Sequence, residues 1–320
     1  MNSPANKIIT INKKLDYFLI YCPLWFPLIY LWVISNFPSI SPFVFILSIF
    51  LFAETHFAST WLFFFDRENI TWIKTNFYKI AILPIFTLFF VMFMWVFTPN
   101  IVLILHYLAS GFHVTRQSIG ITKISNTNNK KNSFLIYFIS AFCLIIGLIN
   151  PGILASSFSI NQINIIIFLI STFYLLTTFY SIPLIKGISP IVTGISIYLP
   201  LLFFDNLAIA TVVGVGMHWC QYIVLMFAIN LRKNKLNNIK LESKNFLKNR
   251  FLFVIFYSLV MTSLTFLGMP KNSLGIGNYS FLYLIPLLFQ LYHFYLDGFI
   301  WKFSDKHIRG SVSKYIFQRL

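Results

Sequence analysis

Long apolar stretches alternate with short polar segments along almost the whole chain. A window of about 19 residues approximates the helix length that crosses the hydrocarbon core of a bilayer. This pattern predicts an all-α fold, a polytopic transmembrane helical bundle of about ten spans. The apolar stretches lie at 17–35, 43–65, 78–97, 101–122, 134–150, 163–180, 188–204, 207–231, 251–268 and 279–301.

Composition agrees with a membrane protein. The 320 residues are 58% hydrophobic and only 10% charged, and the mean hydropathy is +0.78. A soluble domain carries roughly 25% charged residues, so a soluble fold is excluded. We expect a single integral membrane domain over residues 1–320. Its main polar parts are a short basic N-terminus (1–16), a basic loop (231–250) and a basic tail (302–320).

The distribution of positive charge orients the predicted spans. With the N-terminus inside, 23 of the 24 Lys and Arg residues fall in inside segments and only Lys271 falls outside. Positive residues collect on the cytoplasmic side of membrane proteins. We therefore expect a multi-pass protein of the cytoplasmic (inner) membrane with both termini in the cytoplasm. The net charge of +16 then reflects contact with anionic membrane lipids, and no nucleic-acid partner is expected.

Several common signatures are absent from the sequence. Cys22, Cys143 and Cys220 all lie in apolar segments and form no CxxC pair, which favours a packing role over a disulfide or thiolate site. There is no Gly-rich phosphate loop and no nucleophile elbow. The N-terminus lacks a signal-peptide cleavage pattern, so we expect the first span to stay in the mature protein.

Histidines are concentrated inside the predicted spans. The second, fourth, eighth and tenth spans, which all run from outside to inside, carry a histidine 11 to 14 residues from the outer end. At 1.5 Å per residue these depths differ by only about 4–5 Å. Ionisable groups inside a membrane are costly and usually functional. One layer near the bilayer midplane could therefore hold His56, His113, His218 and His293, with His106 two turns from His113 as a fifth candidate.

Polar residues one helical turn from these histidines suggest supporting roles. Neighbours at i±3 or i±4 share a helix face and can orient a metal-bound histidine. Asp297 follows His293 by four residues, as Thr60 follows His56. Candidates for orienting ligands or handling protons are Asp297, Glu54, Gln117 and Gln221. Candidates for the pocket wall, for which aromatic packing is the simpler interpretation, are Tyr107, Tyr222 and Tyr292.

The ligand types favour a non-haem Fe(II) centre. Imidazole suits iron, zinc and copper, and no thiolates lie near these histidines. Zinc hydrolysis stays open, because Glu54 or Asp297 could serve as its carboxylate base. A substrate that reaches a midplane site would be lipophilic and would enter from the bilayer. Iron with open coordination positions could activate O₂ against it, while apolar walls exclude water.

Four short patches resemble the bacterial β-carotene-cleaving dioxygenases of the Brp/Blh type. They are "ETHFAST", "LHYLASGFHVTRQ", "GMHWCQ" and "YHFYLDGFIWK". The resemblance implies a histidine-bound non-haem iron and an oxidoreductase (dioxygenase) that splits carotenoids into retinal-like aldehydes. It supports an iron-dependent membrane oxygenase acting on a carotenoid, another isoprenoid or a lipid.

Other functions remain open from the sequence. Paired histidines could ligate haem in a b-type electron-transfer protein. A transporter or proton relay could use intramembrane His, Asp and Glu, although such a path would string polar residues out along its length. A lipid-modifying transferase could also use a membrane-embedded histidine. Lastly, each histidine could be an ordinary interhelical hydrogen-bond partner.

Overall fold

The computed structural model is mostly helical over the residues it describes, and these residues include no strand. The described residues are 8–125, 130–157, 183–236, 242–269 and 280–316, together with 162, 165, 169 and 172. The all-α prediction is thereby confirmed. Among them, five helices are long and apolar enough to cross a membrane, or six if one bent pair counts as a single span. Ten spans and cytoplasmic termini stay predictions.

The spans that meet this test coincide with predicted ones. The predicted span 17–35 is bent by 59° between the helices Lys13–Tyr21 and Trp25–Asn36. The predicted spans 101–122 and 279–301 are single helices, although they do not meet the test of length and apolarity. The predicted span 163–180 lies almost wholly outside the described residues. Five described helices meet the test of length and apolarity. They are Pro38–Phe64, Tyr78–Phe97, Lys130–Ile149, Leu207–Lys233 and Asn249–Gly268.

The chain divides into two compact units. The first comprises Met1–Ser48 and Gly111–Leu225, and the second comprises Ile49–Ser110 and Met226–Leu320. The chain changes unit three times: between Ser48 and Ile49, within α7 (Pro99–Ile124) and within α12 (Leu207–Leu236). The prediction of a single membrane domain is not tested by this division.

In the first unit, short polar contacts and close approaches hold the helices. Here α10 (Pro183–Ser196) packs against α8 (Lys130–Ile149) and η2 (Tyr17–Tyr21). The Tyr17 hydroxyl and the Ser189 hydroxyl are 2.5 Å apart, and Thr193 donates to the Tyr21 carbonyl at 3.0 Å. Gly216 permits contact with the Phe26 ring, because a Cβ there would lie 2.0 Å from it. Such small residues let membrane helices pack closely. Among the described residues, the other helices that lie wholly in this unit are α1 (Lys13–Asp16), α2 (Trp25–Asn36), η3 (Pro38–Ile40), α3 (Ser41–Ser48), η7 (Ala155–Ser157) and α11 (Pro200–Phe203).

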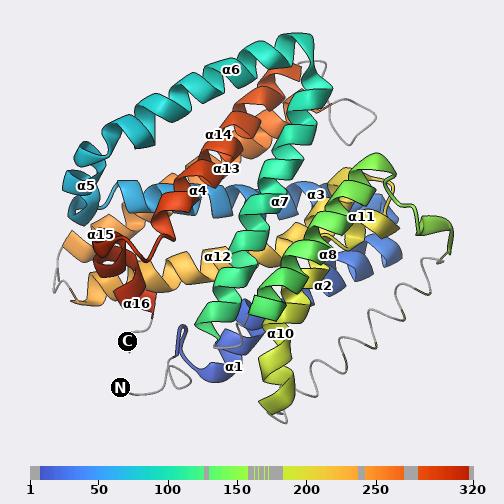
Figure 1. The fold of residues 1–320 in the computed structure, drawn as a ribbon, viewed down its shortest axis with the longest axis horizontal. Coiled ribbons are helices and arrows are strands. Elements are labelled where there is room, and N and C mark those ends of the chain that lie inside the picture. Colours follow the sequence, from blue (N-terminus) through green and yellow to red (C-terminus); the bar gives the residue numbers. More distant parts are fainter. Residues whose placement is uncertain are drawn as a thin grey trace. The chain divides into compact units, whose positions relative to one another are not determined.

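In the second unit, α13 (Glu242–Gly268) and α14 (Ser280–Ile300) lie side by side (Figure 1). The π-helical turn η4 (Ile49–Glu54) leads into α4 (Thr55–Phe64). Both η4 and α4 pack against α13, and α4 also packs against α14, as does α6 (Leu83–Phe97). The shorter elements are η5 (Arg67–Asn69), α5 (Ile70–Thr75), η6 (Tyr78–Ile82), α15 (Lys306–Ile308), η9 (Arg309–Ser313) and α16 (Lys314–Ile316).

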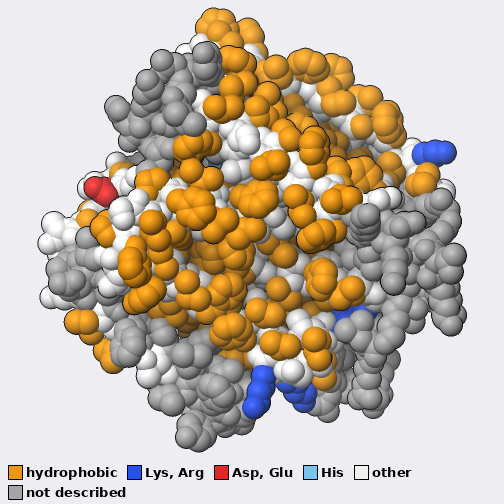
Figure 2. All heavy atoms as spheres, turned by 180° about the vertical axis from the view of Figure 1, so that it is seen from behind, with side chains coloured by type: hydrophobic (Ala, Val, Ile, Leu, Met, Phe, Trp, Pro, Cys, Tyr) orange, Lys and Arg blue, Asp and Glu red, His pale blue; other side chains and the backbone are white. Residues whose placement is uncertain are grey.

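Exposed side chains on these helices are strongly apolar. Only 11% of the most apolar part of Tyr78–Phe97 is buried, and Phe86, Phe89, Phe90 and Phe93 are each more than half exposed. Hydrophobic side chains cover most of the coloured surface in Figure 2, with few charged ones between them. A helix that is apolar on its exposed face is suited to lipid contact.

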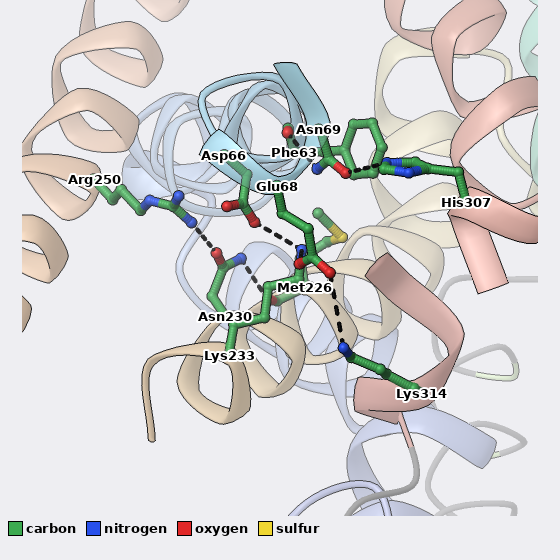
Figure 3. A network of polar contacts seen from close by, with 10 residues as sticks. All are labelled: Phe63, Asp66, Glu68, Asn69, Met226, Asn230, Lys233, Arg250, His307 and Lys314. Atoms are coloured by element: carbon green, nitrogen blue, oxygen red, sulfur yellow. Dashed lines mark hydrogen bonds and ion pairs between the residues drawn. The ribbon is translucent and has the colours of Figure 1, made fainter. Parts of the chain in front are cut away.

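The segment 306–316 docks on the second unit. Its residues Ile308, Val312, Tyr315 and Ile316 are buried. A polar network surrounds the docked segment (Figure 3): Lys233 lies 2.7 Å from Asp66 and 3.5 Å from Glu68, and Lys314 lies 3.7 Å from Glu68. The buried Arg232 donates to the carbonyls of Tyr315 and Ile316, at 3.0 and 2.7 Å. The segment 306–316, within the expected basic tail, is thus a packed part of this unit.

Candidate metal centre

Two helices of the second unit bring four polar side chains together. On α4, His56 and Thr60 are one turn apart, and on α14, His293 and Asp297 have the same spacing. Because α4 packs against α14, the two i, i+4 pairs face each other. All four residues are buried, with exposures of 0–2%. Polar groups so deeply buried in an apolar segment must satisfy one another or bind something.

Hydrogen bonding around Thr60 favours one tautomer of His293. The Thr60 hydroxyl donates to Asp297 Oδ1 at 3.2 Å, and it lies 2.7 Å from His293 Nδ1. A threonine hydroxyl has one hydrogen, and a carboxylate only accepts. With that hydrogen directed to Asp297, the hydrogen between Thr60 and His293 belongs to Nδ1, and Nε2 carries the lone pair when the imidazole is neutral.

A tryptophan near the end of α14 holds the Asp297 carboxylate. The indole N–H of Trp301 donates to Asp297 Oδ2 at 3.2 Å, while Thr60 donates to Oδ1. Each carboxylate oxygen thus accepts one neutral donor and keeps capacity for another contact. The two donors orient the carboxylate, as supporting residues do around metal ligands.

The remaining electron pairs of this group converge. His293 Nε2 and Asp297 Oδ2 are 3.8 Å apart, and one ligand atom from each of His56, His293 and Asp297 lies within 4.8 Å of the other two. Metal–ligand bonds of about 2.1 Å place tetrahedral ligand atoms about 3.4 Å apart. A contraction of up to about 1.4 Å between these atoms would therefore let all three bind one cation. His293 Nε2 and Asp297 Oδ2 face each other, and both can donate an electron pair to a cation between them. These residues therefore suit a metal ion.

The ligand group is walled by aromatic rings. The His56 and His293 rings meet edge to face with centroids 4.5 Å apart. Phe57 lies 4.9 Å from the His56 ring and 5.0 Å from the His293 ring, and Phe294 lies 5.6 Å from His293. Such walls exclude water and lower the local dielectric.

A second, partly buried polar chain lies in the same unit. His106 Nε2 and Gln290 Oε1 are 2.9 Å apart, and Gln290 Nε2 donates to Glu54 Oε1 at 3.3 Å. Because Oε1 of an amide only accepts, His106 carries its hydrogen on Nε2. His106 and Glu54, both predicted site residues, are thus joined through Gln290.

The predicted ligands His113 and His218 lie in the first unit. Their rings are 5.6 Å apart at an interplanar angle of 86°, both are buried, and Tyr222 lies 6.4 Å from the His218 ring. Within the first unit the structure brings His113 and His218 together, and within the second unit it brings His56 and His293 together. The convergence of all four histidines stays a prediction.

Three other predicted site residues have described surroundings. Gln221 donates to the Ile20 carbonyl at 2.5 Å inside the first unit, and the Tyr292 hydroxyl donates to the Ile80 carbonyl at 2.5 Å. Both bonds tie helices together. Gln117 lies on α7 in the first unit.

Sequence reasoning missed two supporting residues. Trp301 lies at i+4 from Asp297, on the same helical face, and this spacing was the available signal. The sequence marks Thr60 only as a neighbour of His56, whereas its hydroxyl bridges to α14. Asp297, expected to support a ligand, has its own oxygen among the ligand atoms.

Comparison with known proteins gives no relative. No protein-family model, no curated protein and no solved structure matches this chain. The candidate centre is therefore interpreted from its own geometry.

Proposed function

We propose that this protein is a ten-span protein of the cytoplasmic membrane, with cytoplasmic termini, whose second unit binds a metal ion through His56, His293 and Asp297. The observation that carries the proposal is the convergence of two imidazoles and one carboxylate in an apolar segment, with facing atoms 3.8 Å apart. Two histidines and one carboxylate with open positions are the ligand set of non-haem Fe(II) oxygenases. Iron is thus the favoured metal.

The proposed reaction is the oxidation of a lipophilic substrate by O₂. Bound iron would supply O₂ activation. The protein's own contribution is to orient the ligands through Thr60 and Trp301 and to exclude water with Phe57 and Phe294. A carotenoid or another isoprenoid is the proposed substrate class, because the sequence patches around the histidines resemble carotenoid-cleaving enzymes.

The geometry disfavours a haem at this pair of histidines. A haem with two axial histidines holds them on opposite faces of its porphyrin plane. The His56 and His293 rings contact each other edge to face at 4.5 Å, which leaves no layer for a porphyrin between them. Non-haem metal is therefore the better proposal for this group.

Metal analysis and an optical spectrum of detergent-purified protein test the proposal. We expect about one iron per chain, no Soret band, and loss of the metal in His293→Ala and Asp297→Asn. His307→Ala is the matched control, because His307 bonds to Asn69 and stacks on Trp72, away from these ligands in sequence and contacts. Metal retained by both ligand variants, or a Soret band, would overturn the assignment.

Substrate class is tested separately. The wild-type chain is produced in bacteria that make β-carotene, beside Asp297→Asn. Retinal-like aldehydes formed only with the wild type would support carotenoid cleavage. Iron binding without any aldehyde would retain the metal centre and move the substrate to another lipid class.

A further inference from the structure

Hydroxyl groups form a buried stripe on one face of α13. Ser258, Thr262 and Thr265 follow one another at spacings of four and three residues, which places them on one helix face. Their exposures are 0%, 7% and 7%. This face contributes to the interior of the second unit, where α13 packs against η4, α4 and α14.

Two of these hydroxyls lack the bond that threonine usually makes inside a helix. Ser or Thr in an apolar helix commonly donates to the carbonyl four residues earlier. Ser263, directly beside the stripe, does so to Leu259 at 2.8 Å, as does Ser59 to Thr55 at 2.7 Å. Thr262 Oγ1 and Thr265 Oγ1 are buried and have no hydrogen-bond partner among the described residues.

The stripe meets η4 beside Glu54. The Thr55 hydroxyl donates to the Phe50 carbonyl at 3.0 Å and lies 3.1 Å from the Ser258 hydroxyl. The Thr55 hydrogen is thus already used, so Ser258 must donate to Thr55. The acceptor capacity of Ser258 then remains for another donor.

One further polar atom beside this junction is unsatisfied. Glu54 precedes Thr55, and its Oε2 is buried with no hydrogen bond among the described residues. The buried hydroxyl of Tyr257, which precedes Ser258, has the Trp61 side chain as its polar neighbour. Each buried polar atom without a partner costs about 1–3 kcal/mol. Thr262 Oγ1, Thr265 Oγ1 and Glu54 Oε2 are three such atoms, and together they indicate a site for a small hydrogen-bonding ligand.

We propose that the α13 stripe binds a short file of water molecules that leads from Thr265, through Thr262, to the polar junction of Tyr257 and Glu54. Residues one turn apart on a helix are about 5–6 Å apart, which equals two hydrogen bonds of about 2.8 Å through one water. Buried waters typically make two to four such bonds. The file would hydrate one end of the Glu54–Gln290–His106 chain, whether or not a metal is bound.

X-ray hydroxyl-radical footprinting in H₂¹⁸O tests this directly, because radicals formed from bound water label the side chains beside it. The reporters are Tyr257 and the buried Met261, the neighbour of Thr262. We expect ¹⁸O labelling of both in the wild type and at least a several-fold loss in Thr262→Val/Thr265→Val. The control Ser263→Ala removes an exposed hydroxyl that is already bonded to its own helix and should label like the wild type.

The stability of the Thr262→Val/Thr265→Val variant provides a second test. Valine has the shape of threonine without its hydroxyl, so it stabilises a site in which the hydroxyl is buried dry and unpaired. A more stable double variant with unchanged labelling would overturn the proposal, as would a wild type unlabelled at Tyr257. A double variant that loses labelling without gaining stability would support it.

Discussion

Thr60 connects two helices through one hydroxyl. It accepts the Nδ1 hydrogen of His293 and gives its own hydrogen to Asp297, so it sets the tautomer of one metal ligand and the orientation of another. Without it, either nitrogen of His293 could carry the hydrogen, and only one tautomer leaves Nε2 ready to bind.

Replacing Thr60 tests this role at the scale of one residue. Thr60→Val, which keeps the shape, should weaken metal binding by roughly 10–100-fold, the usual effect of losing such a supporting partner. Thr60→Ser keeps the hydroxyl and should bind nearly as the wild type does. Competition with a coloured chelator measures the affinity, and circular dichroism checks the fold. Equal affinities for the valine and serine variants would contradict the assignment.

Trp301 donates to the other oxygen of the Asp297 carboxylate, so its replacement can be compared with that of Thr60. Trp301→Phe removes the donor to Asp297 Oδ2 and preserves a large ring. We expect a smaller loss of affinity than for Thr60→Val, because Asp297 keeps the Thr60 bond while His293 is untouched. The same chelator competition measures it, and a loss larger than that of Thr60→Val would reverse the order of importance.

Only part of this local chemistry could be predicted from the sequence. The pair His293 and Asp297 follows from i, i+4 spacing, and the structure places the two side chains 3.8 Å apart. The bond from Thr60 to α14 joins residues 233 positions apart. This bond depends on how α4 packs against α14. The spacing of residues within a single helix carries no information about that packing.

At the scale of elements, apolar windows predicted helices well and their irregularities poorly. The predicted span 43–65 lies within the helix Pro38–Phe64 except for its last residue. Its middle, however, is the π-helical turn η4. A π turn inserts a residue and rotates the rest of the helix, and such turns often lie at functional sites. Here it ends at Glu54, just before His56. No residue type in "IFLFAE" signals that turn, and the structure shows only that it packs against α13.

The docked segment 306–316 gives a test at this scale. Lys233 and its partner Asp66 are only 8% and 16% exposed, so Lys233→Met leaves a nearly buried carboxylate unpaired. We expect a loss of about 3–5 kcal/mol in the free energy of unfolding. Lys314→Met breaks the more exposed pair with Glu68, 46% and 35% exposed, and should cost about 0–1 kcal/mol.

Thermal unfolding in detergent compares the two lysine variants. A clearly lower melting temperature for Lys233→Met than for Lys314→Met is the expected order. Equal melting temperatures would mean that the network in Figure 3 contributes little to stability.

At the scale of the whole molecule, charge asymmetry makes a prediction about orientation. Asn100 and Lys306 are both exposed, and the ten-span arrangement puts Asn100 outside and Lys306 inside. A membrane-impermeant thiol reagent applied to intact cells should label Asn100→Cys but not Lys306→Cys. Background is low, because the three native cysteines are buried. Labelling of Lys306→Cys from outside would contradict the arrangement.

The number of spans was the hardest property to predict at this scale. The predicted spans 101–122 and 279–301 are helices, but polar residues such as His106, Arg116, Gln290 and Asp297 lower their apolarity. The polar residues that suggest a function also lower the hydropathy by which a membrane span is recognised. Length and hydropathy alone therefore undervalue the helices that carry candidate chemistry.

The contact between Arg232 and the docked segment also bears on biosynthesis. The carbonyls that receive the Arg232 guanidinium come 83 and 84 residues later in the chain. A ribosome therefore delivers α12, then α13 and α14, before these two acceptors reach the Arg232 guanidinium. A chain stalled before Tyr315 would lack both carbonyls and the buried side chains of Tyr315 and Ile316. Such a chain would leave the end of α12 without the cover of the docked segment, a mark by which quality-control proteases could recognise unfinished molecules.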